Sequence, residues 1–303
     1  MMSEFRSGFV AVVGQPNVGK STLINALLGQ KIAAVSPRPQ TTRHRQLGIL
    51  TTENAQLVFV DTPGMHTPRH KLGRFLNQEA EESLAGVDVI LFLVDVSHAP
   101  DDEDRRIAAL LANLKRHPKM ILGLNKIDLL AEERLEPRLA DYRALLPKAI
   151  HVSFSAARGD GRPELLQTLV EHLPLRLPDY PPDQLTDLYE REIAGDLIRE
   201  AALLFLRDEV PHGLAVRIDE FTERGEAGAY IGATLFVERE SQKGIVIGEG
   251  GLMLKKIGSS ARQEIESMSG RKVFLQLRVK VAKDWRNDEN MLNRFGFKLK
   301  KKK

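Results

Sequence analysis

One segment of the chain has the residue types and spacing of a phosphate-binding loop. Gly14-Gln15-Pro16-Asn17-Val18-Gly19-Lys20-Ser21 matches the pattern GxxxxGK[ST], directly after an apolar run and directly before a helical pattern. Its glycines let backbone N–H groups point inward, and the N-terminus of the following helix adds a positive dipole end. We therefore expect Lys20 to reach the β- and γ-phosphates of a nucleotide and Ser21 to ligate Mg²⁺.

A second motif, Asp61-Thr62-Pro63-Gly64, comes directly after the apolar run Leu57–Val60. A carboxylate at this point can hold the shell of a bound Mg²⁺, and Gly64 lets its N–H approach the γ-phosphate. The placement is informative because ligands of doubly wound sheets bind at the carboxyl ends of the strands.

The third motif, Asn125-Lys126-Ile127-Asp128, follows the apolar run Met120–Leu124. The carboxylate of Asp128 can accept two hydrogen bonds from guanine N1–H and the exocyclic amine, a donor pair that adenine lacks. Ser155-Ala156 then completes the set as a loop over the base. We therefore predict a guanine-nucleotide site whose contacts are made by Gly14, Gln15, Pro16, Asn17, Val18, Gly19, Lys20, Ser21, Thr22, Asp61, Thr62, Pro63, Gly64, Met65, Asn125, Lys126, Asp128, Ser155 and Ala156.

A GxxG segment near the C-terminus could bind an RNA backbone. Gly248-Glu249-Gly250-Gly251 lies between the apolar run Ile245–Ile247, which we expect to be a strand, and a helical pattern. In KH domains such a loop clamps about four nucleotides, because glycines let phosphates approach the helix N-terminus. Ile245, Ile247 and Ile257 are expected to form the groove floor. The predicted RNA-binding residues are Ile245, Ile247, Gly248, Gly250, Gly251, Lys255, Lys256 and Ile257.

The elements that position these motifs alternate in the order of an α/β fold. Near-continuous apolar runs are typical of buried parallel strands, and they are separated here by helical patterns. We expect a doubly wound, mostly parallel sheet followed by a smaller α+β domain of KH type. Four prolines between Pro174 and Pro182 favour an extended linker. The predicted boundaries are residues 1–173, a linker at 174–184, and residues 185–303.

Composition narrows the classes further. The 303 residues are 42% hydrophobic and 28% charged, enough for about two domains with buried cores. The absence of cysteine excludes disulfides, thiolate zinc sites and cysteine nucleophiles. No run approaches the roughly 18 apolar residues that cross a bilayer, and no secretory signal is apparent. Residues 271–303 carry a net charge of +9, which leaves −6 for the rest and indicates an anionic partner.

The motifs together resemble the Era family of bacterial GTPases, over essentially the whole chain. The resemblance rests on QPNVGKS, on Gln40-Thr41-Thr42-Arg43-His44, on DTPG, on NKID and on the C-terminal RNA-binding domain. It implies that Thr42, with Thr41 as the alternative, joins Ser21 and Asp61 at Mg²⁺. It further implies that the KH domain binds the 3′ end of 16S ribosomal RNA during 30S subunit assembly, in a mostly monomeric cytoplasmic protein.

The residues expected to carry out hydrolysis differ from those of Ras-type enzymes. Ras-type enzymes place a water-orienting Gln directly after the DxxG glycine, but this chain has Met65, which predicts slow unaided turnover. In relatives of Era an Asn at the position of Asn17 is associated with a bound K⁺; the other interpretation is that Asn17 only stabilises the loop. The residues expected to act in hydrolysis are Lys20, Thr42, Gly64 and Asn17.

Two alternatives accompany this prediction. The chain could be a membrane-associated signalling GTPase that sets its basic C-terminus on anionic lipid of the inner membrane, on the cytoplasmic face. It could instead be an RNA-binding module whose nucleotide is only structural. The single tryptophan, Trp285, is expected to pack in the core or, alternatively, to stack on a base.

Overall fold

The computed structural model describes residues 5–35, 42–68, 70–114, 118–225 and 228–297. The chain forms two compact units. The first contains the described parts of residues 1–33, 42–67 and 76–187, and the second those of 34–41, 68–75 and 188–303.

The first unit is built on a six-stranded sheet in the order β2-β3-β1-β4-β5-β6, in which only the β2–β3 pair is antiparallel. The order reverses at β1, so the carboxyl end of β1 is where a ligand of such a sheet binds. The strands are β1 (Arg6–Val13), β2 (Gln46–Thr51), β3 (Ala55–Asp61), β4 (Val89–Asp95), β5 (Lys119–Asn125) and β6 (Ile150–Phe154).

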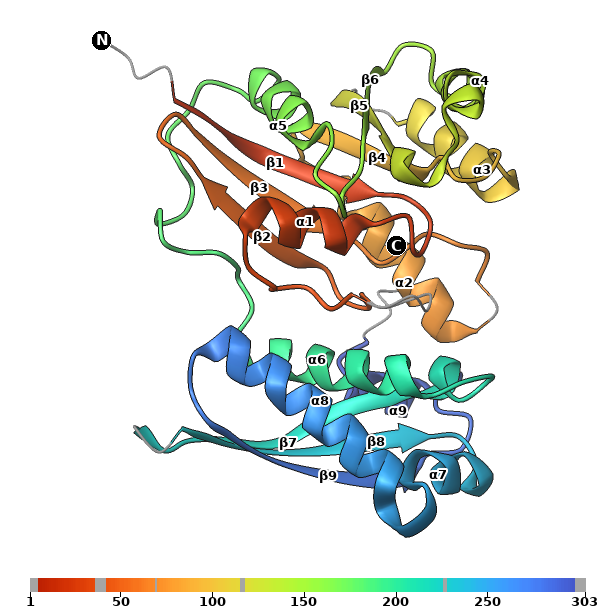
Figure 1. Ribbon diagram of the computed structural model, residues 1–303, viewed down its shortest axis with the longest axis vertical. Coiled ribbons are helices and arrows are strands. Elements are labelled where there is room, and N and C mark those ends of the chain that lie inside the picture. The colour runs from red at the N-terminus through yellow and green to blue at the C-terminus, as the bar shows by residue number, and fades with distance from the viewer. Residues whose placement is uncertain (1–4, 36–41, 69, 115–117, 226–227, 298–303) are drawn as a thin grey trace. The chain divides into compact units, whose positions relative to one another are not determined.

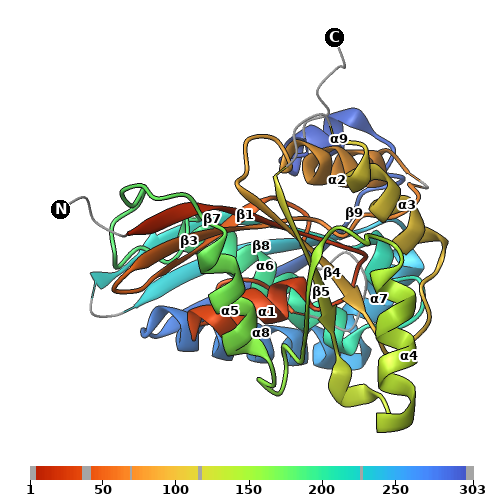
Figure 2. The ribbon, with the colours of Figure 1, turned by 90° about the horizontal axis from the view of Figure 1, so that it is seen from above.

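Helices cover both faces of this sheet (Figure 1 and Figure 2). Leu23 of α1 and Leu165 of α5 pack with strand residues in one core, whereas Ile107 of α3 and Tyr142 of α4 pack in the core on the other face. These two apolar layers explain why β3 and β4 are buried along their whole length. The helices are α1 (Lys20–Leu28), α2 (Lys71–Glu82), α3 (Asp102–Ala112), α4 (Glu132–Arg143) and α5 (Arg162–Glu171), with a short 3₁₀ turn η1 (Ile127–Leu129).

The structure confirms the predicted doubly wound, mostly parallel sheet, with one addition. The edge strand β2 was not expected, because QLGILT mixes polar and apolar residues without a clear period. It pairs with β3 from Gln46↔Asp61 to Thr51↔Gln56. This pairing brings Gln46 beside Asp61.

The proline-rich segment is held along the first unit by a buried glutamine. Gln56 donates to the carbonyl oxygen of Tyr180 (2.8 Å) and accepts from the N–H groups of Asp179 (2.9 Å) and Tyr180 (3.0 Å). Further on, Ile49 donates its N–H to the oxygen of Leu185 (2.8 Å). The segment is therefore extended, as expected from its prolines, and is fixed on the β2–β3 side; the exact domain boundaries stay predictions.

The second unit packs helices against one face of a three-stranded sheet of order β7-β8-β9, with β7–β8 antiparallel and β8–β9 parallel. Leu197 of α6 and Ile257 of α8 share a core with Leu235 of β8, and Figure 1 shows the two helices side by side over the strands. The elements are α6 (Glu190–Phe205), η2 (Pro211–Gly213), β7 (Ala215–Glu223), β8 (Ala229–Val237), α7 (Glu240–Ile247), η4 (Glu249–Gly251), α8 (Leu252–Ser269), β9 (Val273–Val281) and α9 (Glu289–Arg294).

Two expectations for this unit need correction. Ile245–Ile247 was expected to be a strand but is the last turn of the helix α7, so the GxxG segment joins two helices. The second expectation concerns Trp285, whose ring contacts that of Phe295, the residue directly after α9; Phe295 also packs on Phe236. Trp285 is fully buried and donates to the oxygen of Gly213 (2.8 Å), so the core interpretation is confirmed and base stacking is wrong.

Candidate functional site

The phosphate-loop segment curls tightly between β1 and α1. Gly14 has φ 153° and Gly19 has φ 105°. A Cβ on Gly14 would lie 2.2 Å from the carbonyl oxygen of Leu93, and one on Gly19 would lie 2.4 Å from Nδ2 of Asn125. Only glycine therefore fits at these two positions. At Gly14 there is no space for a side chain, and at Gly19 the backbone angle excludes one as well.

Lys20 is buried at the start of α1, and its ammonium group points back into the loop. Its Nζ donates to the carbonyl oxygens of Gln15 (2.8 Å) and Gly14 (3.2 Å). Burial lowers the pKa of Lys20 to about 8, although the nearby charge of Asp61 opposes this shift. A partly desolvated cation held by carbonyl dipoles is well placed to attract phosphate oxygens.

Raising the pH is expected to weaken nucleotide binding through Lys20. The free protein loses the Lys20 proton above a pKa of about 8, whereas bound phosphates would keep it protonated. Binding then takes up a proton, so GDP affinity should fall by up to about tenfold per pH unit above that point. Calorimetry from neutral pH to about pH 9 measures this fall, and guanosine, which lacks phosphates, is the control. Parallel curves for GDP and guanosine would contradict the assignment.

Three oxygen-bearing side chains meet beside the loop. Ser21 Oγ lies 2.9 Å from Asp61 Oδ2 and 3.0 Å from Thr42 Oγ1, and Thr42 Oγ1 lies 3.2 Å from the same carboxylate oxygen. Gln46, which the sequence did not single out, donates to Asp61 Oδ2 (3.2 Å). Burial raises the pKa of Asp61, while Lys20 and the hydrogen-bond donors oppose the rise.

This cluster fits a magnesium ion. The second carboxylate oxygen of Asp61 is buried and has no hydrogen-bond partner in the described part of the chain. Two hydroxyls and a carboxylate are the hard oxygen ligands that Mg²⁺ prefers, with water and nucleotide phosphate completing its shell. The structure thus brings together Ser21, Thr42 and Asp61 as predicted, while the alternative ligand Thr41 and its neighbour Gln40 lie outside the described residues.

The DTPG segment passes directly against the phosphate loop. A Cβ on Gly64 would lie 2.6 Å from the nitrogen of Pro16, so a glycine is required for this approach. Met65 donates its N–H to the oxygen of Gly14 (3.1 Å), and its side chain is fully buried. Thr62 is also buried and donates to the oxygen of Val12 (2.8 Å). The side chains of Thr62 and Met65, both predicted to contact the nucleotide, therefore have structural roles.

Asn125 braces the two loops that would enclose a nucleotide. Its Nδ2 donates to the oxygen of Val18 (2.7 Å) in the phosphate loop. Its Oδ1 accepts from the N–H of Ala156 (2.9 Å) in the loop after β6. The side chain is nearly fully buried. Asn125 thus fixes the spacing between the phosphate loop and the base loop.

Lys126 and Asp128 come directly after Asn125, at the carboxyl end of β5. Lys126 has φ 69° and donates to the carboxylate of Asp95 (2.5 Å). Burial alone would raise the pKa of Asp95, but hydrogen bonds from Lys126 and Ser97 hold it below its usual range. Asp128 lies in η1 and is half-buried. Asp95 was missed in the sequence, although its place at the carboxyl end of β4 is the available signal.

The remaining residues predicted to contact the nucleotide lie around the carboxyl ends of the strands. Ser155 is buried, and its hydroxyl oxygen accepts the N–H of Arg158 (3.0 Å), which shapes the loop after β6. Gln15 donates to Asp101 (2.6 Å) at the start of α3. Asn17 is exposed and has φ 65°. The first unit therefore brings all three predicted motifs to the carboxyl ends of β1, β3, β5 and β6.

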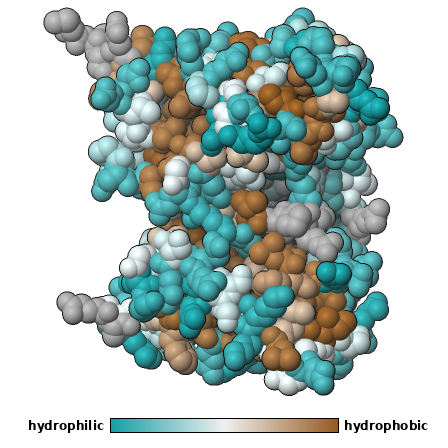
Figure 3. Space-filling view, in the orientation of Figure 1, coloured by the Kyte–Doolittle hydropathy of each residue, from teal (hydrophilic) through white to brown (hydrophobic). Residues whose placement is uncertain are grey.

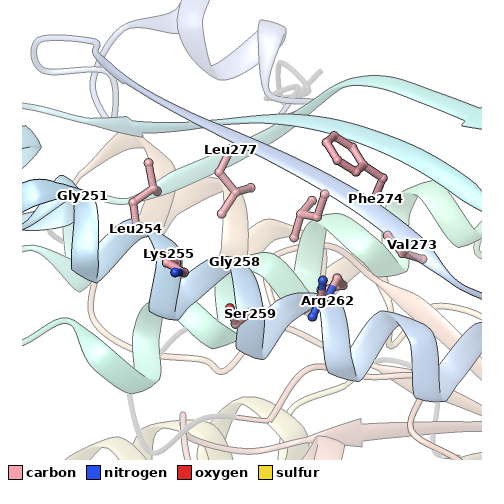
Figure 4. A pocket seen from close by; sticks show the side chains of 10 residues that line it. Gly251, Leu254, Lys255, Gly258, Ser259, Arg262, Val273, Phe274 and Leu277 are labelled. Atoms are coloured by element: carbon pink, nitrogen blue, oxygen red, sulfur yellow. The ribbon is translucent and has the colours of Figure 1, made fainter.

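The second unit carries a groove between α8 and β9 (Figure 4). All three glycines of GEGG have positive φ, namely 74° at Gly248, 56° at Gly250 and 80° at Gly251, so the chain turns sharply into α8. Lys255 and Arg262 of α8 supply positive charge along the groove. Its lining residues are Gly251, Leu254, Lys255, Gly258, Ser259, Arg262, Val273, Phe274, Leu275 and Leu277.

The predicted floor of this groove is wrong. Ile257 is fully buried in the core beneath α8, and Ile245 is half-exposed on α7. The apolar wall is made by Leu254 with Leu275 and Leu277 instead. Of the predicted RNA-binding residues, Gly251 and Lys255 line the groove. Ile245, Ile247, Gly248, Gly250, Lys256 and Ile257 do not, and the ammonium group of Lys256 lies 4.4 Å over the ring of Phe205.

Comparisons with known proteins agree with both halves of the site. A family model described as 50S ribosome-binding GTPase matches residues 9–126, and a KH domain model matches residues 209–286. GTPase Era of Geotalea uraniireducens is 47% identical, covering 97% of this chain and 98% of that protein. GTPase Era of Ruminiclostridium cellulolyticum is 44% identical, covering 98% and 99%.

Solved structures match over the same length. Era in complex with MgGDPNP and nucleotides 1506–1542 of 16S ribosomal RNA is 39% identical, with a TM-score of 0.91, covering 97% of this chain and all of that one. A variant of Aquifex aeolicus Era bound to GDP·AlF₄⁻ is 38% identical, with a TM-score of 0.90 and the same coverage. One of these relatives thus binds both a magnesium–guanine nucleotide and a fragment of 16S ribosomal RNA.

Proposed function

Because the chain belongs to the Era family of GTPases, we propose that it is a GTP-driven switch that binds 16S ribosomal RNA and acts in assembly of the 30S subunit. The observation that carries the proposal is the match of both units to a relative solved with MgGDPNP and a 16S fragment. In this chain, the groove between α8 and β9 has the apolar wall and flanking cations that unstacked bases and phosphates require. The same proposal places the protein in the cytoplasm, mostly as a monomer.

The switch would depend on groups that meet a γ-phosphate. Thr42 and Gly64 lie on segments that flank the phosphate loop, and both approach it closely. In GTPases such segments are ordered by contacts to the γ-phosphate and Mg²⁺ and are released on hydrolysis. We expect the RNA-bound form to be the GTP form and hydrolysis to release the RNA.

Reversing two charges in the groove should weaken RNA binding. Phosphate contacts set the salt dependence of affinity, so Lys255→Glu with Arg262→Glu should lower the slope of log affinity against log salt by about two. At low salt the loss should be about tenfold or more. Fluorescence anisotropy with a 16S 3′-end oligonucleotide and the protein loaded with a non-hydrolysable GTP analogue measures both quantities.

The matched control reverses two exposed lysines at the other end of the first sheet, Lys119, the first residue of β5, and Lys148, which precedes β6. This pair changes the net charge equally but lies outside the groove. If the two double variants lost RNA affinity equally, the effect would be a non-specific one of net charge, and the proposal would be contradicted.

We also propose that K⁺ assists hydrolysis beside Asn17. Asn17 is exposed in the phosphate loop at φ 65°, and amide and backbone oxygens are suitable ligands for K⁺. Met65 is buried, so its side chain cannot orient water. Hydrolysis should be slow unaided, several times faster in K⁺ than in Na⁺ at equal ionic strength, and indifferent to the cation after Asn17→Ala. Equal rates of the parent protein in the two salts would contradict this role.

A membrane-associated signalling role gains no support from the relatives. In the described part of the chain no helix combines the length and hydrophobicity of a membrane crossing. On the face that Figure 3 draws, apolar areas lie among hydrophilic residues. The basic tail at residues 298–303 lies outside the described residues. Loss of liposome binding, with RNA affinity intact, on removing Lys300–Lys303 would favour this alternative.

A further inference from the structure

An exposed aromatic pair lies on the outer face of the second sheet, the face opposite α6 and α8. Phe274 of β9 is 64% exposed, and its ring stacks on that of Tyr230 of β8 with centroids 5.7 Å apart and planes at 17°. The two residues are direct partners in the parallel register of β8 and β9. One ring face of Phe274 is thus supported by protein, while most of the side chain is open to solvent.

The supporting ring is itself fixed from several sides. Tyr230 donates its hydroxyl to Oε1 of Gln276 (2.6 Å), and the guanidinium of Arg224 lies 5.2 Å over its ring. The pair is therefore pre-organised, and a planar ligand would lose little entropy of the protein on binding.

Another aromatic residue on the same face of β8 is covered by the protein itself. Phe236, six residues along the strand from Tyr230, is only 6% exposed. It packs against Phe295 at 4.9 Å and lies under the guanidinium of Arg217 at 5.1 Å. The protein covers this ring with its own C-terminal segment and leaves Phe274 exposed. Exposure of Phe274 is therefore a local feature of one end of the sheet.

The exposed ring is continuous with the RNA groove. Phe274 borders the groove, and Figure 4 shows its ring on the side of β9 away from α8, whereas Leu277 points toward α8. Arg262 stands at the same end of the groove. Arg278 and Lys280 follow Phe274 along the exposed face of β9. A strand of RNA that leaves the groove at this end meets an aromatic ring flanked by cations.

We propose that Phe274 stacks a base of single-stranded RNA that extends beyond the groove, with Arg278 and Lys280 near its phosphates. This proposal rests on RNA binding by the groove. The combination matches that of other sequence-tolerant single-strand sites, in which aromatic rings stack on bases and a basic groove follows the backbone. Two acids of β7 lie toward this face: Asp219 is engaged by Arg217 (2.7 Å) and Thr234 (2.6 Å), and Glu220 accepts from the hydroxyl of Thr222 (3.2 Å).

Length dependence of RNA affinity tests the proposal. A tetranucleotide fills a KH clamp of about four nucleotides, whereas a decanucleotide reaches the outer face. In the full chain loaded with a GTP analogue, Phe274→Ala should weaken the decanucleotide about tenfold, as expected from loss of one base–aromatic stack, and should weaken the tetranucleotide far less, because the ring points away from α8 (Figure 4). Tyr189→Ala, at an aromatic residue that is 79% exposed elsewhere in the second unit, should change neither.

Fluorescence provides a second, independent readout. The natural chain has one tryptophan, the buried Trp285, so Phe274→Trp adds a single exposed indole. This variant should keep decanucleotide affinity, and its emission should be quenched by the decanucleotide but not by the tetranucleotide.

The outcomes separate this inference from the proposed function. Decanucleotide binding that is lost in the groove double variant but unchanged in Phe274→Ala would overturn the stacking role and leave the groove intact. Unchanged RNA affinity combined with loss of self-association in Phe274→Ala would assign the ring to a second copy of the chain, which also overturns the inference. Absence of RNA binding by the parent protein would refute the proposed function itself.

Discussion

Replacing Lys20 with alanine is expected to lower the affinity for GTP and GDP by about a hundredfold or more. The ammonium group is buried, is held by the carbonyl oxygens of Gly14 and Gln15, and is the cation directed into the loop. Removing one partner of a buried, hydrogen-bonded charge pair typically costs about 2–5 kcal/mol, and each 1.4 kcal/mol is a factor of ten. Equilibrium titration with a fluorescent guanine nucleotide measures the loss.

Stability gives the control for this variant. Burial disfavours the charged form of Lys20, as its lowered pKa shows, so removing the charge should not destabilise the nucleotide-free protein. Lys20→Met, which keeps most of the side-chain volume, should bind as poorly as Lys20→Ala and melt at or above the temperature of the parent protein. Unchanged GTP affinity in either variant would refute the assigned phosphate loop.

Replacing Asp128 with asparagine should exchange the base preference of the site. A carboxylate accepts from both guanine donors, whereas an amide presents one acceptor and one donor group. The donor meets the exocyclic amine of guanine unfavourably but suits xanthine, which carries an oxygen in place of that amine. Sites that hydrogen-bond one base reject a mismatched one strongly, so GTP affinity should fall by about a hundredfold or more while xanthosine triphosphate gains. Competition titrations of the two nucleotides measure the ratio.

Asn125→Ala is the matched control for Asp128→Asn. Asn125 holds the phosphate loop at Val18 and the base loop at Ala156. Its loss should weaken GTP and xanthosine triphosphate alike and leave their ratio unchanged. Guanine selectivity that persists in Asp128→Asn would show that the base contact lies elsewhere.

Much of the first unit could be predicted because its sequence signals are strong and local. Buried parallel strands read as apolar runs, and each nucleotide motif follows such a strand directly. The strand β2 was missed because an edge strand with mixed residues has no distinct period. Its register with β3 decides that Gln46 meets Asp61, and a register of this kind depends on partners far away in the chain.

The second unit shows where a local pattern misleads. Three consecutive β-branched residues at Ile245–Ile247 favour a strand by propensity, yet they complete the helix α7. A short apolar run does not distinguish the two, and packing of Val246 in the core decides the outcome. Ile257 was predicted at the floor of the groove, but its side of α8 faces the core.

Side-chain bracing could not be predicted at all from one sequence. Asn125 was expected to contact the nucleotide, and only the fold shows that both ends of its amide are used by Val18 and Ala156. Asp95 likewise gains its role from Lys126, which comes 31 residues later in the chain. Such pairs are set by the order of strands in the sheet, which brings β4 beside β5.

The central claim is that the guanine nucleotide controls binding of RNA by the groove. Ultraviolet crosslinking of the full chain to 16S ribosomal RNA, mapped by sequencing, tests it in one measurement when the protein is loaded with either a non-hydrolysable GTP analogue or GDP. We expect crosslinks at the 3′ end of the RNA in the GTP-like form and their loss in the GDP form. Crosslinks of equal strength and position in both forms would contradict a switch, and crosslinks confined to other regions would contradict the proposed target.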